Sequence, residues 1–167
     1  MNSMSSGSKI DYSGRTVDLL LLKTMLEVPA VNKRMGIDVS NVHGEPMIVS
    51  GIEKMVQRYA LCFINAMGST RFMPSHGTEI VPDVMSGKVY SMATLETSAA
   101  IANLSALEQI QAADSGEDTP DDERLVNAVV TDLEFSRQKA MVRISVRLTS
   151  AAGESFVYII PVAVGVH

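Results

Sequence analysis

The chain has 167 residues, of which 46% are hydrophobic and 20% are charged, and its formal net charge is −5. This length fits one domain, and the acidic balance argues against nucleic-acid binding, which depends on Lys and Arg neutralising phosphates. The single cysteine, Cys62, cannot form an internal disulfide. The most concentrated apolar run, residues 19–22, is far shorter than the roughly 20 residues of a membrane-spanning helix. We therefore expect a soluble protein, made in a reducing compartment, that binds neither nucleic acid nor membrane.

The N-terminal part divides into two predicted segments. Residues 1–15 are polar, rich in serine and glycine, and carry no signal-peptide apolar core, so we expect them to be flexible. Residues 16–49 form an N-terminal extension, in which the apolar stretch 16–25 predicts one strand. Prolines and glycines make the rest of this extension a predicted loop. The remaining residues, 50–167, are expected to form an α+β domain.

The next segment predicts a helix that begins with a capping box and ends at a glycine. Ser50 and Glu53 have the capping-box spacing, and Gly68 is expected to end the helix. Lys54 and Arg58 fall on the face opposite the apolar one, so we expect them to be solvated or at a partner interface. The predicted buried stripe, at three- and four-residue spacing, consists of Ile52, Met55, Val56, Tyr59, Phe63 and Met67.

Beyond this helix the pattern predicts a loop or short extended stretch over residues 69–85, then a second helix over about 91–113. The second helix is rich in alanine and apolar over a wide surface, which suits a helix covered on more than one side. Residues 114–123 contain six acids and are expected to form an exposed loop.

The last third predicts three strands, over residues 126–135, 140–149 and 156–164. The middle one alternates between apolar and polar residues, as in a sheet with one buried face. Short connections indicate an antiparallel meander, and Pro161, which has no amide hydrogen, indicates an edge strand. The predicted fold class is α+β, with two main helices packed on one face of an antiparallel sheet.

No constellation for catalysis, metal binding or cofactor binding stands out. His43, His76 and His167 are far apart and have no ligand spacing, and Cys62 is expected to be a small buried residue. The acidic loop offers carboxylates that could serve glycoside hydrolysis or calcium binding, although a solvated loop is the favoured interpretation. We therefore expect no catalytic, metal or cofactor residues.

Two neighbouring motifs carry a family resemblance. Residues 51–59 read GIEKMVQRY, and residues 68–78 read GSTRFMPSHGT. Their combination resembles the sheath-initiator family of contractile phage baseplate wedges, which has a tail lysozyme-like fold and is shared with type VI secretion baseplates. In this motif we expect Phe72 to pack back on the core and Pro74 with Gly77 to fix a tight reversal. The matching positions are Ile52, Met55, Val56, Gly68, Phe72, Pro74 and Gly77.

The resemblance departs from the family at one triplet. Family members carry Glu-Pro-Arg just before the meander, where its side chains contact the core helices of the wedge. The matching residues here are Asp122, Glu123 and Arg124, so the proline is replaced by an acid and its rigid turn is lost.

The resemblance implies a structural, non-enzymatic virion protein, present in six copies around the tail and made in the host cytoplasm. Its implied partners are other baseplate wedge proteins, the tail sheath subunit and the tail tube or hub. The implied sheath contact is an edge of the sheet, with Phe156, Tyr158 and Ile160 or the segment 16–22 as candidates. The alternatives are a peptidoglycan-degrading tail lysozyme, with Glu123 as its test residue, and a tail-completion or neck protein.

Overall fold

The computed structural model describes residues 18–19, 41–42, 45–46, 48–116, 118–136 and 141–164. The predictions for residues 1–15, and those for the extension apart from its short strands, lie outside these residues. The helices are α1 (Ile52–Ile64), α2 (Ile80–Met85) and α3 (Met92–Ser115). The long strands are β5 (Leu125–Ser136), β6 (Met141–Ser150) and β7 (Ser155–Ala163). The two-residue strands are β1 (Asp18–Leu19), β2 (Asn41–Val42), β3 (Glu45–Pro46) and β4 (Ile48–Val49).

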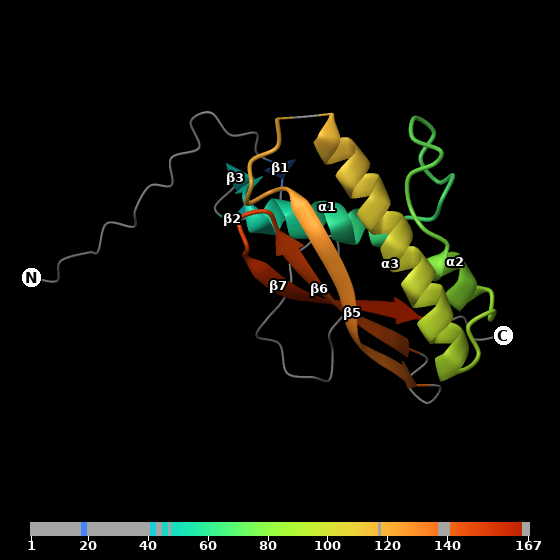
Figure 1. Ribbon diagram of the computed structural model, residues 1–167. Coiled ribbons are helices and arrows are strands. Elements are labelled where there is room, and N and C mark those ends of the chain that lie inside the picture. The colour runs from blue at the N-terminus through green and yellow to red at the C-terminus, as the bar shows by residue number, and fades with distance from the viewer. Residues whose placement is uncertain are drawn as a thin grey trace, which may run out of the picture.

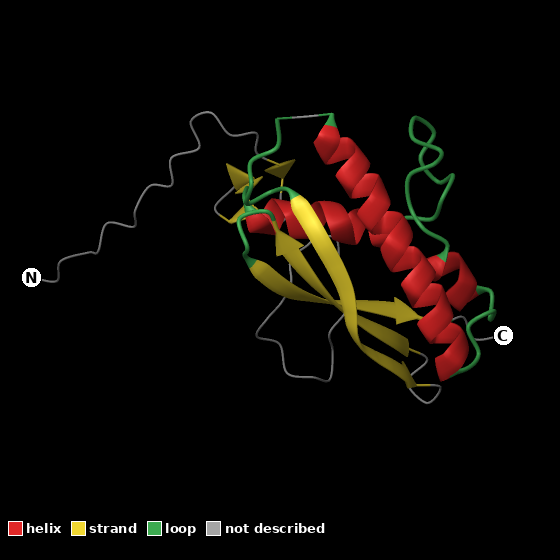
Figure 2. Ribbon diagram, in the orientation of Figure 1, coloured by secondary structure: helices red, strands yellow, loops and turns green. Residues whose placement is uncertain are grey.

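The three long strands form an antiparallel sheet in the order β5-β6-β7, as the meander prediction requires. The helices gather on one side of this sheet (Figures 1 and 2), so the predicted α+β class is confirmed. The short strands make two separate antiparallel pairs, β1 with β4 and β2 with β3. The strand expected within residues 16–25 is therefore seen at Asp18–Leu19.

The core lies between the sheet and the helices. Alternate residues of β6 (Val142, Ile144, Val146 and Leu148) are fully buried, because a strand with period two places one row of side chains against the helices. From α1, Tyr59 and Phe63 are fully buried with ring centroids 5.7 Å apart, as predicted. None of the described helices combines the length and apolar character that crossing a bilayer requires.

The start and the end of α1 differ from the prediction. Its N-cap is Gly51, with no side-chain cap, so the predicted capping box of Ser50 and Glu53 is wrong. Its C-cap is Asn65, whose extended backbone ends the helix before Gly68. Lys54 is buried, which corrects the expectation that it is solvated or at a partner interface.

The N-terminus of helix α3 is capped by a capping box of Ser91 and Thr94. The Ser91 hydroxyl accepts from the Thr94 amide at 3.2 Å, and the Thr94 hydroxyl accepts from the Ser91 amide at 3.0 Å. These reciprocal bonds satisfy two amides that have no partner inside the helix. The predicted second helix is thus confirmed, with bounds within two residues of those expected.

The segment between α1 and α3 contains the predicted loop and, in addition, the helix α2, which the sequence did not predict. Pro82 lies in the first turn of α2, where a missing amide hydrogen costs no helical bond. In the loop before it, Phe72 is 90% exposed, so the expectation that it packs on the core is wrong. The base of this loop is held by Gln109, which accepts from the Gly77 amide at 2.8 Å and donates to the Gly77 carbonyl at 2.9 Å.

Candidate functional site

Two regions of the fold contain the residues that the sequence singled out. The triplet Asp122–Glu123–Arg124 lies in the turn that precedes β5, and the predicted edge is β7. The central residue of the triplet, Glu123, belongs to the interior of the protein.

Glu123 is buried, with 1% of its surface exposed. Its Oε1 accepts from the Gly51 amide at 3.0 Å, and its Oε2 forms an ion pair with Lys54 Nζ at 2.9 Å. The carboxylate therefore lies at the N-terminus of α1, where the helix dipole favours negative charge. This position leaves Glu123 closed to a substrate or partner and makes it a link between α1 and the turn before β5.

A second ion pair lies near the first. Arg58 Nη2 is 2.8 Å from Asp114 Oδ1, and Asp114 Oδ2 accepts from the Leu125 amide at 3.2 Å. Asp114 is 5% exposed, so the acidic segment is not the uniformly exposed loop that its charge predicted. Together the two pairs join α1 to the end of α3 and to the start of β5.

Arg124 differs from Glu123 because it lies at the surface. Its guanidinium forms an ion pair with Asp121, and their side chains are 48% and 66% exposed. Asp122 is half-buried. The triplet thus presents a surface arginine beside a buried glutamate. Its contact with a partner stays a prediction, and Arg124 is the residue of the triplet that a partner can reach.

The sheet has two edges, and the outer edge of β5 is partly occupied. Asn103 Nδ2 of α3 donates to the Ala128 carbonyl at 2.9 Å, and Gln111 Nε2 donates to the Val126 carbonyl at 2.9 Å. The ladder between β5 and β6 also shifts register twice. Side-chain cover and bulges both make an edge a poor template for another strand.

The outer edge of β7 is open within the described part of the chain. In the hairpin to β6, the Ser150 amide donates to the Glu154 carbonyl at 2.9 Å, which marks a hydrogen-bonded pair. Bonded and non-bonded pairs alternate along an antiparallel ladder, and this one continues without a register shift to Met141 and Ala163. Val157, Ile159 and Pro161 therefore direct their backbone groups away from β6. We call the backbone of Val157 and Ile159 the open edge.

The side chains at this edge follow the same alternation. Tyr158 and Ile160 are buried and Phe156 is half-buried, so these predicted interface residues point toward the core. Val157 and Ile159 are 49% and 42% exposed. The period of two along β7 separates these two rows of side chains. That Phe156, Tyr158 and Ile160 belong to a partner interface stays a prediction.

The remaining candidates for chemistry have ordinary environments. Across the described residues, no three His, Cys, Asp or Glu side chains are placed to hold a metal ion. Cys62 is buried, as predicted, and its thiol donates to Gln109 Oε1 at 3.3 Å. Burial raises the pKa of this thiol, and the hydrogen bond with Gly77 opposes that effect less strongly. A raised pKa lowers the thiolate fraction on which cysteine reactivity depends.

Comparison with known proteins gives little similarity. No family model matches the sequence, and no curated protein matches it. One solved structure, described as a "putative tail lysozyme" from Geobacter sulfurreducens, is 14% identical with a TM-score of 0.46, over 72% of this chain and 97% of that chain. Lysozyme names an enzyme class, which contradicts the prediction that this protein is not an enzyme, and that prediction is not retained.

Proposed function

We propose that this protein is a component of a contractile phage tail baseplate that links the wedge to the sheath and nucleates sheath assembly. The observation that carries the proposal is the open edge of β7, at the opposite side of the sheet from a β5 edge that side chains of α3 partly occupy. The order of the motif residues between Ile52 and Gly77 supports it, because that order resembles sheath initiators. In this role the protein is part of the virion, in six copies around the tail.

The open edge recruits the sheath by strand addition. Main-chain amides and carbonyls of an edge strand pair with an incoming extended segment, and this gives affinity without a preformed pocket for every side chain. Most proteins protect such an edge because it invites pairing. A nucleating subunit instead needs one edge that is available and one that is not.

The turn before β5 faces the wedge in this proposal. Arg124 supplies a planar guanidinium that can bind a carboxylate through two hydrogen bonds, which lysine cannot reproduce. Glu123 contributes indirectly, because its bonds to Gly51 and Lys54 fix the turn that presents Arg124. The partners are thus other wedge proteins at this turn, the sheath subunit at β7, and the tail tube or hub.

The test removes one outward amide from the open edge. We expect Ile159→Pro to give baseplates and tubes that assemble but carry no sheath, since proline has no amide hydrogen to donate and its ring clashes with an added strand. Ile159→Ala keeps the amide and is the matched control, which we expect to give sheathed tails. Electron microscopy of purified tails measures the sheathed fraction.

Two results would contradict the proposal. Fully sheathed tails that contain the Ile159→Pro protein would mean that the sheath binds elsewhere. A reconstruction of the intact tail that places this chain away from the first sheath ring would exclude the role altogether.

A further inference from the structure

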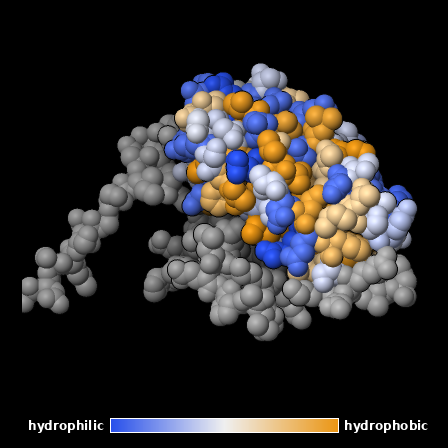
Figure 3. Space-filling model, turned by 60° about the horizontal axis from the view of Figure 1, so that its bottom comes forward, coloured by the Kyte–Doolittle hydropathy of each residue, from blue (hydrophilic) through white to orange (hydrophobic). Residues whose placement is uncertain are grey.

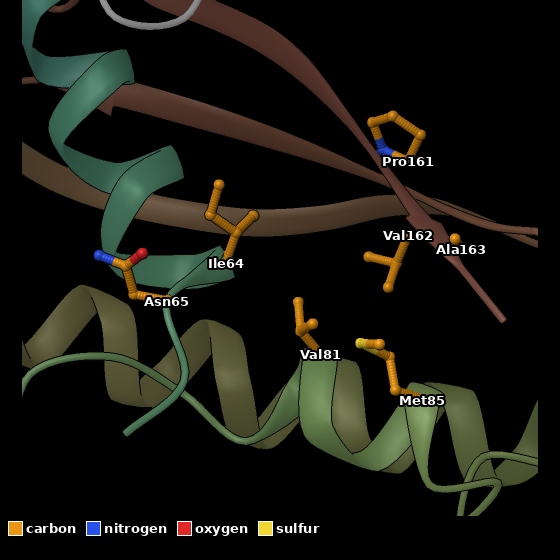
Figure 4. Close-up of a pocket in the computed structure, with 7 residues that line it drawn as sticks. All are labelled: Ile64, Asn65, Val81, Met85, Pro161, Val162 and Ala163. Atoms are coloured by element: carbon orange, nitrogen blue, oxygen red, sulfur yellow. The ribbon is translucent and has the colours of Figure 1, made fainter. Parts of the chain in front are cut away.

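A pocket lies at the C-terminal end of the open edge. Its walls are the end of α1 (Ile64 and Asn65), one side of α2 (Val81 and Met85) and residues 161–163 of β7. Its volume is about 290 Å³. In the close-up, the side chains of Val81, Met85 and Val162 face the space between α2 and β7 (Figure 4). We call this hollow the edge pocket.

The lining of the edge pocket selects an apolar group. Among the described residues that line it, Asn65 is the one polar residue. The backbone of Asn65 is already engaged, because its amide donates to the Leu61 carbonyl at 3.0 Å and its carbonyl accepts from the Thr78 amide at 2.8 Å. An apolar cavity of about 150 Å³ is enough to hold a benzene molecule. The edge pocket can therefore take one large aliphatic or aromatic side chain.

The pocket begins where strand pairing along β7 must stop. Pro161 lies in the outward-facing row with Val157 and Ile159, and it has no amide hydrogen to offer. An added strand can thus accept hydrogen bonds from the amides of Val157 and Ile159. The next outward-facing residue of β7, Pro161, has no amide hydrogen to donate to it. Beyond that point the added strand runs beside Val162, whose side chain lies on the helix side of the sheet and lines the pocket.

Exposed apolar residues alone do not identify the edge pocket as a binding site. The space-filling view shows several separate hydrophobic patches among hydrophilic residues (Figure 3), and exposed apolar side chains such as Ile101 also occur on α3. What distinguishes the edge pocket is its position in line with the open edge. Specificity in strand addition comes from pockets that receive alternate side chains of the added strand.

We infer that the edge pocket receives one large apolar side chain of the strand that pairs with β7, on the helix side of the sheet and opposite Val162. This inference rests on the proposed function, because it identifies a feature of the partner that the open edge binds. The partner segment is then extended, pairs over a short stretch, and ends its pairing with an aliphatic or aromatic anchor. The backbone bonds set its direction and the anchor sets its register.

The experiment places a charge in the pocket without touching the edge amides. Met85 is 54% exposed, so Met85→Glu does not bury a charge in the free protein, and Val81→Glu is a second variant. We expect each to lower the sheathed fraction of tails about tenfold, as for loss of an interface anchor, with an unchanged melting temperature for Met85→Glu. Ile101→Glu adds the same charge on α3 and is expected to leave sheathing unchanged.

The outcomes separate this inference from the proposed function. Normal sheathing with Met85→Glu and bare tails with Ile159→Pro would overturn the pocket and leave the edge as the sheath site. Normal sheathing with both would overturn both, and equal loss with Ile101→Glu would overturn the pocket. A map of the sheathed tail gives an independent result: a charged residue or a glycine opposite Val162 would also overturn it.

Discussion

Replacing Lys54 by methionine should destabilise the fold more than a surface ion pair could explain. The substitution keeps most of the side-chain volume but removes the charge that lies 2.9 Å from Glu123. The carboxylate, 1% exposed, then keeps the Gly51 amide as a donor but loses its cation. Breaking a buried pair by removing one partner costs about 3–5 kcal/mol, which is a large part of the about 5–15 kcal/mol that stabilises a typical domain.

Urea unfolding measures this cost. With a slope of about 2 kcal/mol per molar, a loss of about 4 kcal/mol lowers the urea midpoint by about 2 M. Lys88→Met is the matched control, because Lys88 also pairs with a carboxylate, at 2.8 Å from Asp83, but its side chain is 71% exposed. We expect little change in its midpoint, since exposed pairs contribute little.

The double variant Lys54→Met with Glu123→Gln isolates the unpaired charge. The amide oxygen of glutamine still accepts from Gly51, and no unpaired buried charge remains at position 123, so we expect the double variant to be more stable than Lys54→Met alone. If Lys54→Met and Lys88→Met have the same midpoint, the buried ion pair does not stabilise the fold as we reason. A double variant less stable than Lys54→Met would also refute the argument.

Three further predictions concern the core, one glycine and the dependence on pH. Phe63→Ala should lower the free energy of unfolding by about 3–5 kcal/mol, because Phe63 is fully buried; an unchanged melting temperature would refute this. Gly77→Ala should lower the melting temperature more than Gly68→Ala: both have positive φ, but only at Gly77 would a Cβ lie 2.5 Å from the Asn65 oxygen. Burial raises the pKa of Tyr59 above its ordinary 10.0, so the unfolded chain ionises first, and stability should fall above about pH 10. Tyr59→Phe should make that fall shallower in urea unfolding across pH 9–11, and an equal slope would contradict it.

The sheet and α3 could be predicted because their signals are local. The alternation along residues 140–149 predicts one buried row, and the structure buries Val142, Ile144, Val146 and Leu148. The short connections then leave the antiparallel order β5-β6-β7 as the natural arrangement. The cap of α3 likewise depends on two residues three positions apart, Ser91 and Thr94.

The start of α1 could not be predicted because its chemistry is not local. Ser50 and Glu53 have the spacing of a capping box, but the carboxylate that binds the amide of Gly51 comes from Glu123, 72 positions away. The same contact explains why Lys54 is buried on a face that looks polar in sequence. Helical periodicity predicts the face of the helix on which each residue lies. It does not predict which residue from a distant turn will contact that face.

The candidate site was predicted in outline but not in detail. Pro161 correctly indicated that the last strand lies at an edge. The hydrogen bond between Ser150 and Glu154 in the preceding hairpin determines which residues of β7 direct their backbone groups away from β6. The alternation of apolar and polar residues does not reveal this geometry. The edge pocket depends on α2, a segment that contains Pro82 and for which the sequence predicts a loop or short extended stretch.

The unequal edges of the sheet limit how far any assembly through this sheet can grow. In the terms of polymer chemistry, a unit with two reactive ends extends a chain, whereas a unit with one reactive end starts or stops it. Asn103 and Gln111 occupy carbonyls along β5, so strand addition at β7 makes this sheet a monofunctional unit. Two copies that paired through β7 would form a closed dimer rather than a fibre. An assembly that starts from a partner strand bound at β7 can grow in one direction only, away from this protein.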